Sequence, residues 1–347
     1  MEGPGEISIS IVIPTHNRKE KLLRLIRSLL ESTFPVNESS IIVVNDRSSD
    51  GTAEAVRDAF PNIMLITNSE EGFISKSRNI GIHTSTGQYV FLVDDDNVVD
   101  RNCISELVGT FVGDPTGSIG VVGPIMCYLE KPELIWCAGV RRNMVTSLTR
   151  FIGRGEINEG QYHDLMESED FPNSFMISRE VIEKVGVFDE VLFPIHYEEA
   201  DLGERARRKG FRVMCNPRAK TWHDIPVPKK GDDKTRTHHL QNDIRAYYSG
   251  RNRVLFLKKY ASPVRYLLFI SLFNWPLTCY YFRIMLTART KNRRERVQLA
   301  RSYMSGIIDG MRFVTTSASI ELSNQSNKTE AQQPGVTIDA SNRDERR

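Results

Sequence analysis

The acidic triplet Asp94-Asp95-Asp96 is the feature of this sequence that most clearly indicates chemistry, because it directly follows the apolar run YVFLV at 89–93. Adjacent carboxylates repel one another, while an apolar run of this length is typical of a buried strand. A divalent cation among the carboxylates would remove the repulsion, and aspartate oxygens suit Mg²⁺ and Mn²⁺. The triplet therefore predicts a metal site at the end of a strand; the alternative is a solvated acidic turn.

Two further polar segments also follow apolar runs. THNR at 15–18 follows ISISIVI at 7–13, and NDRSSDGT at 45–52 follows a second β-branched run. Between the apolar runs lie helical patterns, for example RKEKLLRLIRSLLEST, which places leucines and an isoleucine on one face. Alternating strands and helices predict an α/β fold with a mostly parallel, Rossmann-like sheet that helices cover on both faces. Ligands bind beyond the carboxyl ends of such strands, so the three polar segments should meet in one site.

Composition restricts the broad class of protein. The chain has 347 residues, of which 40% are hydrophobic and 26% charged, which is typical of a globular protein. A net charge of +2 gives no general attraction to nucleic acid. Five scattered cysteines without a C-x-x-C pair indicate neither a zinc ribbon nor a disulfide framework, and they favour a reducing compartment. We recognise no secretory leader at the N-terminus.

Four motifs together resemble the family 2 glycosyltransferases. They are SIVIPTHNR, VNDRSSDGT, SRNIGIHTSTGQYVFLVDDDNV and HYEEADLGERARRKGF, in this order, and the resemblance runs from about residue 8 to about 260. It implies the GT-A fold and inverting transfer of a sugar from a nucleotide diphosphate-sugar, with Mn²⁺ or Mg²⁺ as cofactor. The implied acceptor is a saccharide, lipid-linked in many such enzymes, in the synthesis of a surface polysaccharide or glycan.

The same resemblance predicts the donor site. Asp96 would bind the metal, with Asp94 on the ribose or the metal's water shell and His223, in TWHD, as a further ligand. His223 could instead serve only as a hydrogen-bond hub. The residues expected to bind the nucleotide-sugar are Thr15, Arg18, Asp46, Arg78, Asn79, Asp94 and Asp95.

The resemblance also predicts the catalytic base. Glu198-Glu199 in HYEEADL matches the family's Glu-Asp pair, so Glu199 is the predicted general base and Glu198 the second choice. The family usually has Asp at the second position. Asp201 and Arg205, on the same predicted helix, form either an ion pair or a substrate contact. The predicted acceptor contacts are Asn173, Ser174 and Trp222; Trp222 and Trp136 are alternatively core residues.

The C-terminal region predicts contact with a membrane. Residues 266–282, YLLFISLFNWPLTCYYF, form 17 uncharged residues, and RTKNRRER follows at 289–296. An apolar aromatic helix beside a basic cluster favours association with an anionic membrane surface. We therefore expect a peripheral or monotopic protein on the cytoplasmic face of the cell membrane. A soluble hairpin or a homo-oligomer contact is the alternative, and a true membrane span is the least favoured interpretation.

These features predict three parts of the chain. Residues 1–260 form the GT-A catalytic domain, with a nucleotide-binding half at about 1–100 and an acceptor half at about 101–260. Residues 261–314 form a helical, membrane-associating extension, and 315–347 a disordered polar tail. Three other functions stay open: a polyprenyl-phosphate glycosyltransferase of the same fold, a nucleotidyltransferase and an inactive glycan-binding protein.

Overall fold

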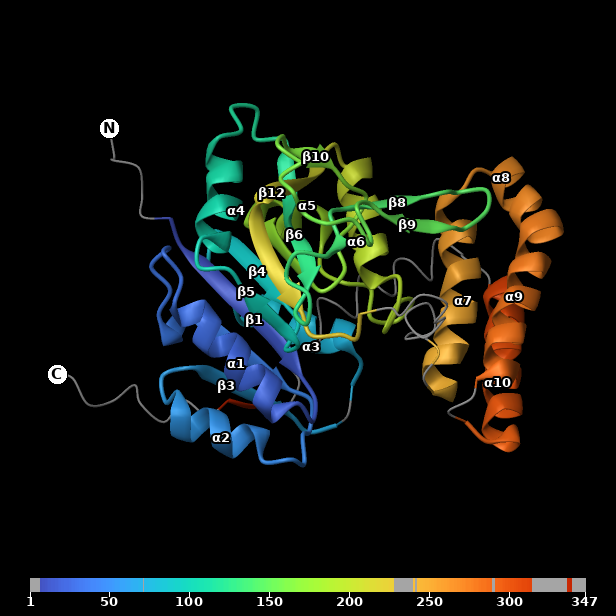
Figure 1. Cartoon of the computed structure of the whole chain (residues 1–347), viewed down its shortest axis with the longest axis horizontal. Coiled ribbons are helices and arrows are strands. Elements are labelled where there is room, and N and C mark those ends of the chain that lie inside the picture. Colours follow the sequence, from blue (N-terminus) through green and yellow to red (C-terminus); the bar gives the residue numbers. More distant parts are fainter. Residues whose placement is uncertain are drawn as a thin grey trace.

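The structure is a computed structural model that describes residues 7–70, 72–227, 240, 242–288 and 291–313, together with the backbone of 336–338. Figure 1 shows a twisted central sheet flanked by helices, with a group of C-terminal helices standing beside it. Apart from 336–338, the predicted tail lies outside the described residues.

Four parallel strands form the first half of the sheet, as the hydrophobic pattern predicts. They are β1 (Ile9–Thr15), β2 (Ile41–Asn45), β3 (Met64–Asn68) and β4 (Tyr89–Val93), and they lie in the order β4-β1-β2-β3. The segments between them contain α1 (Lys19–Leu30), the 3₁₀ turn η1 (Glu38–Ser40), α2 (Thr52–Ala59) and α3 (Ile74–Thr84). The carboxyl ends of β1, β2 and β4 therefore lie along one edge of the sheet.

The strands are buried on both faces, which explains why their sequences are apolar throughout. Ile11 and Ile13 of β1 pack in a core that includes the apolar face of α1, whereas Val12 packs in a second core on the opposite face. Helix α3 covers that second face so closely that a Cβ at Gly81 would lie 2.2 Å from Val12 Cγ1. A larger residue at 81 would push the helix off the sheet.

The second half of the chain extends the same sheet with antiparallel as well as parallel pairs. Its elements are β5 (Asn97–Val99), α4 (Cys103–Val112), β6 (Ile119–Tyr128), β7 (Ile135–Cys137), β8 (Val140–Arg142), β9 (Thr149–Phe151), β10 (Met166–Glu167), β11 (Ser174–Ser178), α5 (Arg179–Val185), α6 (Glu198–Arg208) and β12 (Arg212–His223). The sheet order is β10-β12-β6-β11-β4-β1-β2-β3-β13, in which β13 is Val336–Ile338, whereas β8 and β9 pair with each other in a separate two-stranded sheet. Strand β11 inserts antiparallel between β4 and β6, and β12 runs parallel to β6. Parallel pairing is thus concentrated among β1–β4.

The C-terminal helices pack as a group beside the central sheet (Figure 1). They are α7 (Asp243–Tyr260), α8 (Pro263–Leu268), the π-helical turn η4 (Phe269–Phe273), α9 (Asn274–Thr287) and α10 (Arg293–Arg312). Helices α7 and α10 approach so closely that a Cβ at Gly306 would lie 2.0 Å from the Tyr247 carbonyl oxygen. Among the described helices, none has both the length and the apolarity that crossing a membrane requires.

One short strand lies in the predicted tail. Residues Val336–Ile338 form β13, which pairs antiparallel with β3 at the edge of the sheet. The sequence pattern predicts disorder from 315 onward, and it misses this pairing because three residues are too few to show a strand period.

Candidate active site

The first polar segment and the acidic triplet meet at the carboxyl ends of β1 and β4, as predicted. Thr15 Oγ1 donates a hydrogen bond to Asp95 Oδ2 over 2.8 Å. Arg18 Nη1 lies 2.9 Å from Asp95 Oδ1 and 2.8 Å from Asp96 Oδ2. Two of the three crowded carboxylates therefore share one guanidinium, which offsets part of their mutual repulsion.

The three aspartates face different partners. Asp94 Oδ1 accepts a hydrogen bond from Arg78 Nη2 over 2.8 Å, whereas Asp95 is bound by Thr15 and Arg18. Burial, only partly offset by Arg18, raises the pKa of Asp95 to about 7. Burial also opposes ionisation of Asp96, but His223 and Arg18 outweigh it and lower the pKa of this carboxyl below its usual range. Asp96 is thus the member of the triplet most firmly held as a carboxylate.

Asp96 and His223 form the candidate metal-binding pair. Asp96 Oδ1 and His223 Nε2 are 3.3 Å apart. The imidazole is held in place by Trp136, whose ring centre is 4.5 Å away, and by Asn173 Nδ2, 3.2 Å from each ring nitrogen. The antiparallel pairing of β5 with β12 sets His223 opposite Asn97, and so brings it to the triplet.

Asp96 and His223 have the chemistry of a partial site for a divalent cation. Within the described part of the chain, no group of three or more His, Cys, Asp or Glu side chains is arranged to hold a metal ion by itself. A carboxylate and an imidazole nevertheless suit Mn²⁺, and cations bound with phosphates commonly take only one or two protein ligands, with water and phosphate oxygens as the others. Asp96, whose lowered pKa keeps it ionised, and His223 therefore fit a cation that a bound diphosphate completes.

Arg78 joins the acidic triplet to the predicted base. Its side chain is only 1% exposed, and its two terminal nitrogens contact Asp94 at 2.8 Å and Glu199 at 2.9 Å. Glu198 Oε1 lies 3.7 Å from the same guanidinium. The sequence pattern predicts that Arg78 faces the nucleotide; in the structure its guanidinium lies between carboxylates from β4 and from α6. Three acidic side chains from two distant segments, Asp94 after β4 and Glu198 with Glu199 on α6, thus surround one buried guanidinium.

The two glutamates at the start of α6 have different environments. Glu198 is the more buried, with 6% of its side chain exposed against 16% for Glu199. Burial and the neighbouring Glu199 raise the pKa of Glu198 well above its usual value, and its Oε2 has no hydrogen-bond partner among the described residues. Because a base must be ionised and reachable, this difference favours Glu199 over Glu198.

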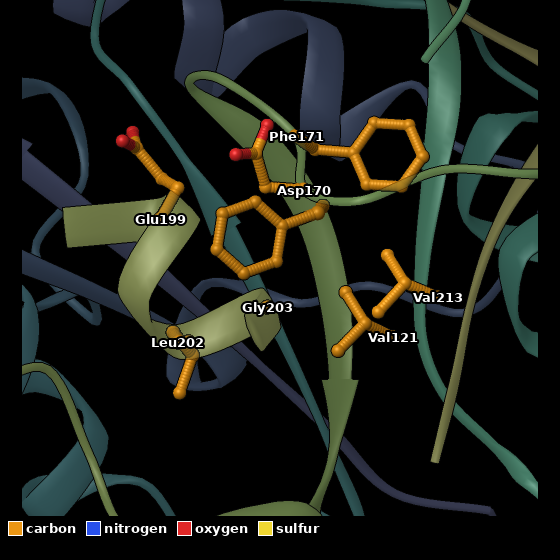
Figure 2. Close-up of a pocket in the computed structure, with 8 residues that line it drawn as sticks. Val121, Asp170, Phe171, Glu199, Leu202, Gly203 and Val213 are labelled. Atoms are coloured by element: carbon orange, nitrogen blue, oxygen red, sulfur yellow. The ribbon is translucent and has the colours of Figure 1, made fainter. Parts of the chain in front are cut away.

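A small cavity of about 10 Å³ lies beside Glu199, with room for about one water molecule. Figure 2 shows the carboxyl groups of Glu199 and Asp170 pointing to the same side, away from Val121 and Leu202. Asp170 is buried and paired with Arg142 at 2.9 Å. The cavity beside the predicted base is therefore lined by apolar side chains and by a second carboxyl group, that of Asp170.

Other predicted residues lie near the site with their side chains bound elsewhere. Asp46 follows β2 beside Thr15, but its carboxylate accepts hydrogen bonds from Asn68 Nδ2 and the Gly72 amide, both at 2.9 Å. The side-chain amide of Asn79 donates hydrogen bonds to the Phe188 carbonyl oxygen and to Glu190, and it accepts one from the Phe188 backbone amide. Their predicted contacts with the nucleotide-sugar stay predictions.

The predicted acceptor residues lie in two different environments. The Asn173 backbone carbonyl accepts a hydrogen bond from the Asp94 amide over 2.8 Å, so this residue lies beside the candidate metal-binding pair. Ser174 is buried on β11, next to it, and its hydroxyl has no hydrogen-bond partner among the described residues. Trp222 is half-buried and packs against the core, as does the buried Trp136. No observation tests their contacts with an acceptor.

Asp201 and Arg205 form an ion pair at 2.7 Å, which is the structural alternative stated for these two residues.

The sequence patterns did not indicate Arg245, which lies in the first turn of α7. This half-buried arginine lies close enough to the site that burial and then Arg18 lower its pKa, with Glu198, Asp94 and Asp96 acting in the opposite direction. The segment QNDIRAYY matches no motif that would have indicated it.

Comparison with known proteins identifies the family. A sequence profile described as "Glycosyl transferase family 2" matches residues 10–186, about half of the chain. This range contains Arg78 and the acidic triplet but ends before Glu199 and His223.

Two curated relatives agree with the profile. "Probable glycosyltransferase YdaM" of Bacillus subtilis (strain 168) is 28% identical over 230 residues, which are 63% of this chain and 51% of that protein. "dTDP-rhamnosyl transferase RfbF" of Shigella flexneri is 24% identical over 316 residues, 89% of this chain and 97% of that protein. The chain spans about half or less of the length of the first curated relatives it matches.

A solved structure, GalNAc-T7 with UDP, GalNAc and Mn²⁺, matches 93% of this chain and 58% of its own, with a TM-score of 0.58 and 14% identity. At this identity the likeness shows the fold alone. The chain belongs to glycosyl transferase family 2 and has the α/β, GT-A fold that its motifs predict.

Proposed function

We propose that the protein is a metal-dependent, inverting glycosyltransferase, and that it transfers a sugar from a nucleotide diphosphate-sugar to a hydroxyl group of a saccharide acceptor. The observation that supports the proposal most strongly is the contact of Arg78 with both Asp94 and Glu199, at 2.8 and 2.9 Å. Because one guanidinium links the acidic triplet to the predicted base, donor and acceptor sites would share one pocket.

The proposed reaction is a single displacement. The acceptor oxygen attacks the anomeric carbon as Glu199 takes the hydroxyl proton. The bond from the anomeric carbon to the diphosphate oxygen breaks on the opposite face, and its electron pair leaves with the nucleoside diphosphate. A cation held by Asp96 and His223 would neutralise charge on the leaving diphosphate, and Arg18 adds a positive charge on the same side.

The identity of the substrates also belongs to the proposal. GalNAc-T7 was solved with UDP and Mn²⁺, and RfbF is described as a dTDP-rhamnosyl transferase, which supports a nucleotide-sugar donor. Another relative, "O-antigen biosynthesis protein RfbC" of Myxococcus xanthus, supports a place in polysaccharide synthesis. A thermal-shift screen with Mn²⁺ and UDP-N-acetylglucosamine, GDP-mannose or dTDP-rhamnose tests donor binding; stabilisation by none of them would count against the donor proposal.

We further propose that the acceptor is lipid-linked and that α8 and α9 rest on the cytoplasmic surface of the cell membrane. Several apolar side chains of α8, of the turn η4 and of α9 are exposed, including Val264 (68%), Leu272 (58%) and Trp275 (44%). Exposed arginines flank this stripe, namely Arg265, Arg283, Arg293 and Arg294. Apolar side chains beside basic ones favour the interface of an anionic membrane.

The double substitution Leu272→Glu with Trp275→Glu should lower the affinity for vesicles of phosphatidylcholine and phosphatidylglycerol by about tenfold or more, because it removes two large apolar contacts. Val112→Glu on α4 is the control, since Val112 is also exposed but lies outside these helices. Vesicle co-sedimentation measures the affinity. Unchanged binding would contradict the membrane proposal, and sedimentation velocity without vesicles would show whether the stripe instead joins two copies of the chain.

A further inference from the structure

The turn that leads into the predicted base has an unfavourable backbone conformation. His196 and Tyr197 have φ angles of 62° and 69°, in the left-handed region that residues with a Cβ seldom adopt. Two such residues in succession directly precede Glu198 and Glu199 at the start of α6. A conformation of this kind persists only where the surrounding structure fixes it.

The backbone of this turn is held by α7. Asn252 is 0% exposed, and its Nδ2 donates hydrogen bonds to the carbonyl oxygens of Ile195 and His196 over 2.8 and 2.9 Å. Its Oδ1 accepts a hydrogen bond from Arg251 Nη1, which also donates to the Leu192 carbonyl oxygen, both over 2.8 Å. The side-chain amide of Asn252 thus uses both of its N–H groups on the two residues that lead into Tyr197.

Side chains of α7 also hold the residues on either side of the glutamates. The Phe256 ring lies 5.3 Å from the Tyr197 ring. One turn into α6, the buried Asp201 accepts a hydrogen bond from Lys259 Nζ over 2.8 Å. Helix α7 therefore contacts the chain both just before the two glutamates, at Tyr197, and just after them, at Asp201.

We infer that Asn252 is a positioning residue for the general base: it holds the left-handed turn at 196–197, which directs Glu199 toward Arg78 and the acceptor. This inference rests on the proposed role of Glu199. It also makes α7 part of the catalytic unit, although α7 lies outside the family match, which ends at 186. Without the two hydrogen bonds, the turn relaxes toward ordinary backbone angles and the start of α6 rotates, which moves the carboxylate away from the acceptor oxygen.

The test compares Asn252→Ala with Asn274→Ala. Asn274 is also fully buried in the C-terminal helices, where its Oδ1 accepts a hydrogen bond from Arg253 Nη2 over 2.8 Å. Among the described residues, its side chain makes no hydrogen bond to the turn at 196–197, called the base turn below. We expect Asn252→Ala to lower kcat about 100-fold, since a displacement of about 1 Å at a reacting group has an effect of this size. The donor KM should stay within about twofold. Asn274→Ala should lower the melting temperature to a similar extent and keep kcat within about twofold.

The readout is nucleoside diphosphate release with Mn²⁺ from UDP-N-acetylglucosamine, GDP-mannose or dTDP-rhamnose, with water as the acceptor when no saccharide is supplied. Asn252→Ser, which keeps one donor, should fall between the wild type and Asn252→Ala. If the folded Asn252 variants keep wild-type kcat, the inference is wrong; it is equally wrong if neither variant folds while Asn274→Ala does, since Asn252 would then be structural. An inactive wild type, or an active Glu199→Gln variant, would instead refute the proposed function and this inference with it.

Discussion

Replacing Glu199 with glutamine should lower kcat about 10²- to 10⁴-fold, the usual contribution of a general base. The amide keeps the size of the side chain and can still contact Arg78, which lies 2.9 Å from Glu199 Oε1, but it cannot take the acceptor proton. Affinity for the donor should stay within about twofold, because donor binding does not need the base. Steady-state kinetics and calorimetric titration of the donor measure the two effects separately.

Glu198→Gln is the matched variant for this experiment. Burial and the neighbouring Glu199 raise the pKa of Glu198 well above its usual value, which favours the neutral carboxyl group that an amide imitates. We expect a loss of kcat below about tenfold. The opposite pattern, a severe loss for Glu198→Gln and a mild one for Glu199→Gln, would reassign the base to Glu198.

The same substitution separates two acceptor classes. Transfer to a saccharide hydroxyl needs a base, whereas a polyprenyl phosphate already carries a negatively charged oxygen that can attack. Glu199→Gln should therefore abolish transfer to a saccharide and spare transfer to a polyprenyl phosphate. A wild-type enzyme that glycosylates a polyprenyl phosphate, and that keeps this activity in the Glu199→Gln variant, would support the rival function of the same fold.

Replacing Asp96 with alanine should weaken Mn²⁺-dependent binding of the nucleoside diphosphate by about 100-fold or more, since loss of an outer partner of a metal ligand already costs about 10- to 100-fold. Asp96 is the member of the triplet whose pKa is lowered, and it lies 3.3 Å from His223, so its removal leaves the candidate pair with one ligand. Titration calorimetry with UDP and Mn²⁺ measures the affinity, and EDTA added to the wild type should reproduce the loss.

Asp224→Ala provides the control for Asp96→Ala. The Asp224 carboxylate lies near the site but is paired with Arg24 at 2.5 Å and Lys21 at 3.3 Å. Its removal should leave Mn²⁺-dependent affinity within about threefold of the wild type, because screened surface pairs contribute little. Metal-dependent binding that survives in Asp96→Ala would contradict the ligand assignment.

The first half of the fold is predictable from the sequence because each element carries a local pattern. Apolar β-branched runs alternate with amphipathic segments, and each buried strand stops at polar residues such as Thr15 or Asp94. Parallel strands bring their carboxyl ends to one edge, so the contacts of Arg18 with Asp95 and Asp96 follow from topology.

The environment of Arg78 could not be predicted in the same way. An arginine near a helix start is commonly exposed, yet Arg78 is buried between Asp94, 16 residues away, and Glu199, 121 residues away. Only the insertion of β11 beside β4, followed by the return of the chain to α6, places these carboxylates together. A local hydrophobic pattern in the sequence cannot reveal a contact between residues that are so far apart in the chain.

The contribution of α7 was missed for a similar reason. Its sequence, DIRAYYSGRNRVLFLKKY, is helical, but it shows no sharp division into apolar and polar faces because it is buried on several sides. Asn252 and Arg253 occupy positions where a surface helix would carry solvated side chains, and both are buried. The residues that hold the base turn were therefore not distinguishable from ordinary helical ones.

The most direct test of the account is the identity and configuration of the products. Wild-type protein is incubated with Mn²⁺, a sugar nucleotide that it binds and a saccharide acceptor, and the products are analysed by anion-exchange chromatography and proton NMR. The account predicts one nucleoside diphosphate released per glycoside formed, with the anomeric configuration opposite to that of the donor. Release of pyrophosphate, or a glycoside that retains the donor's configuration, would contradict it.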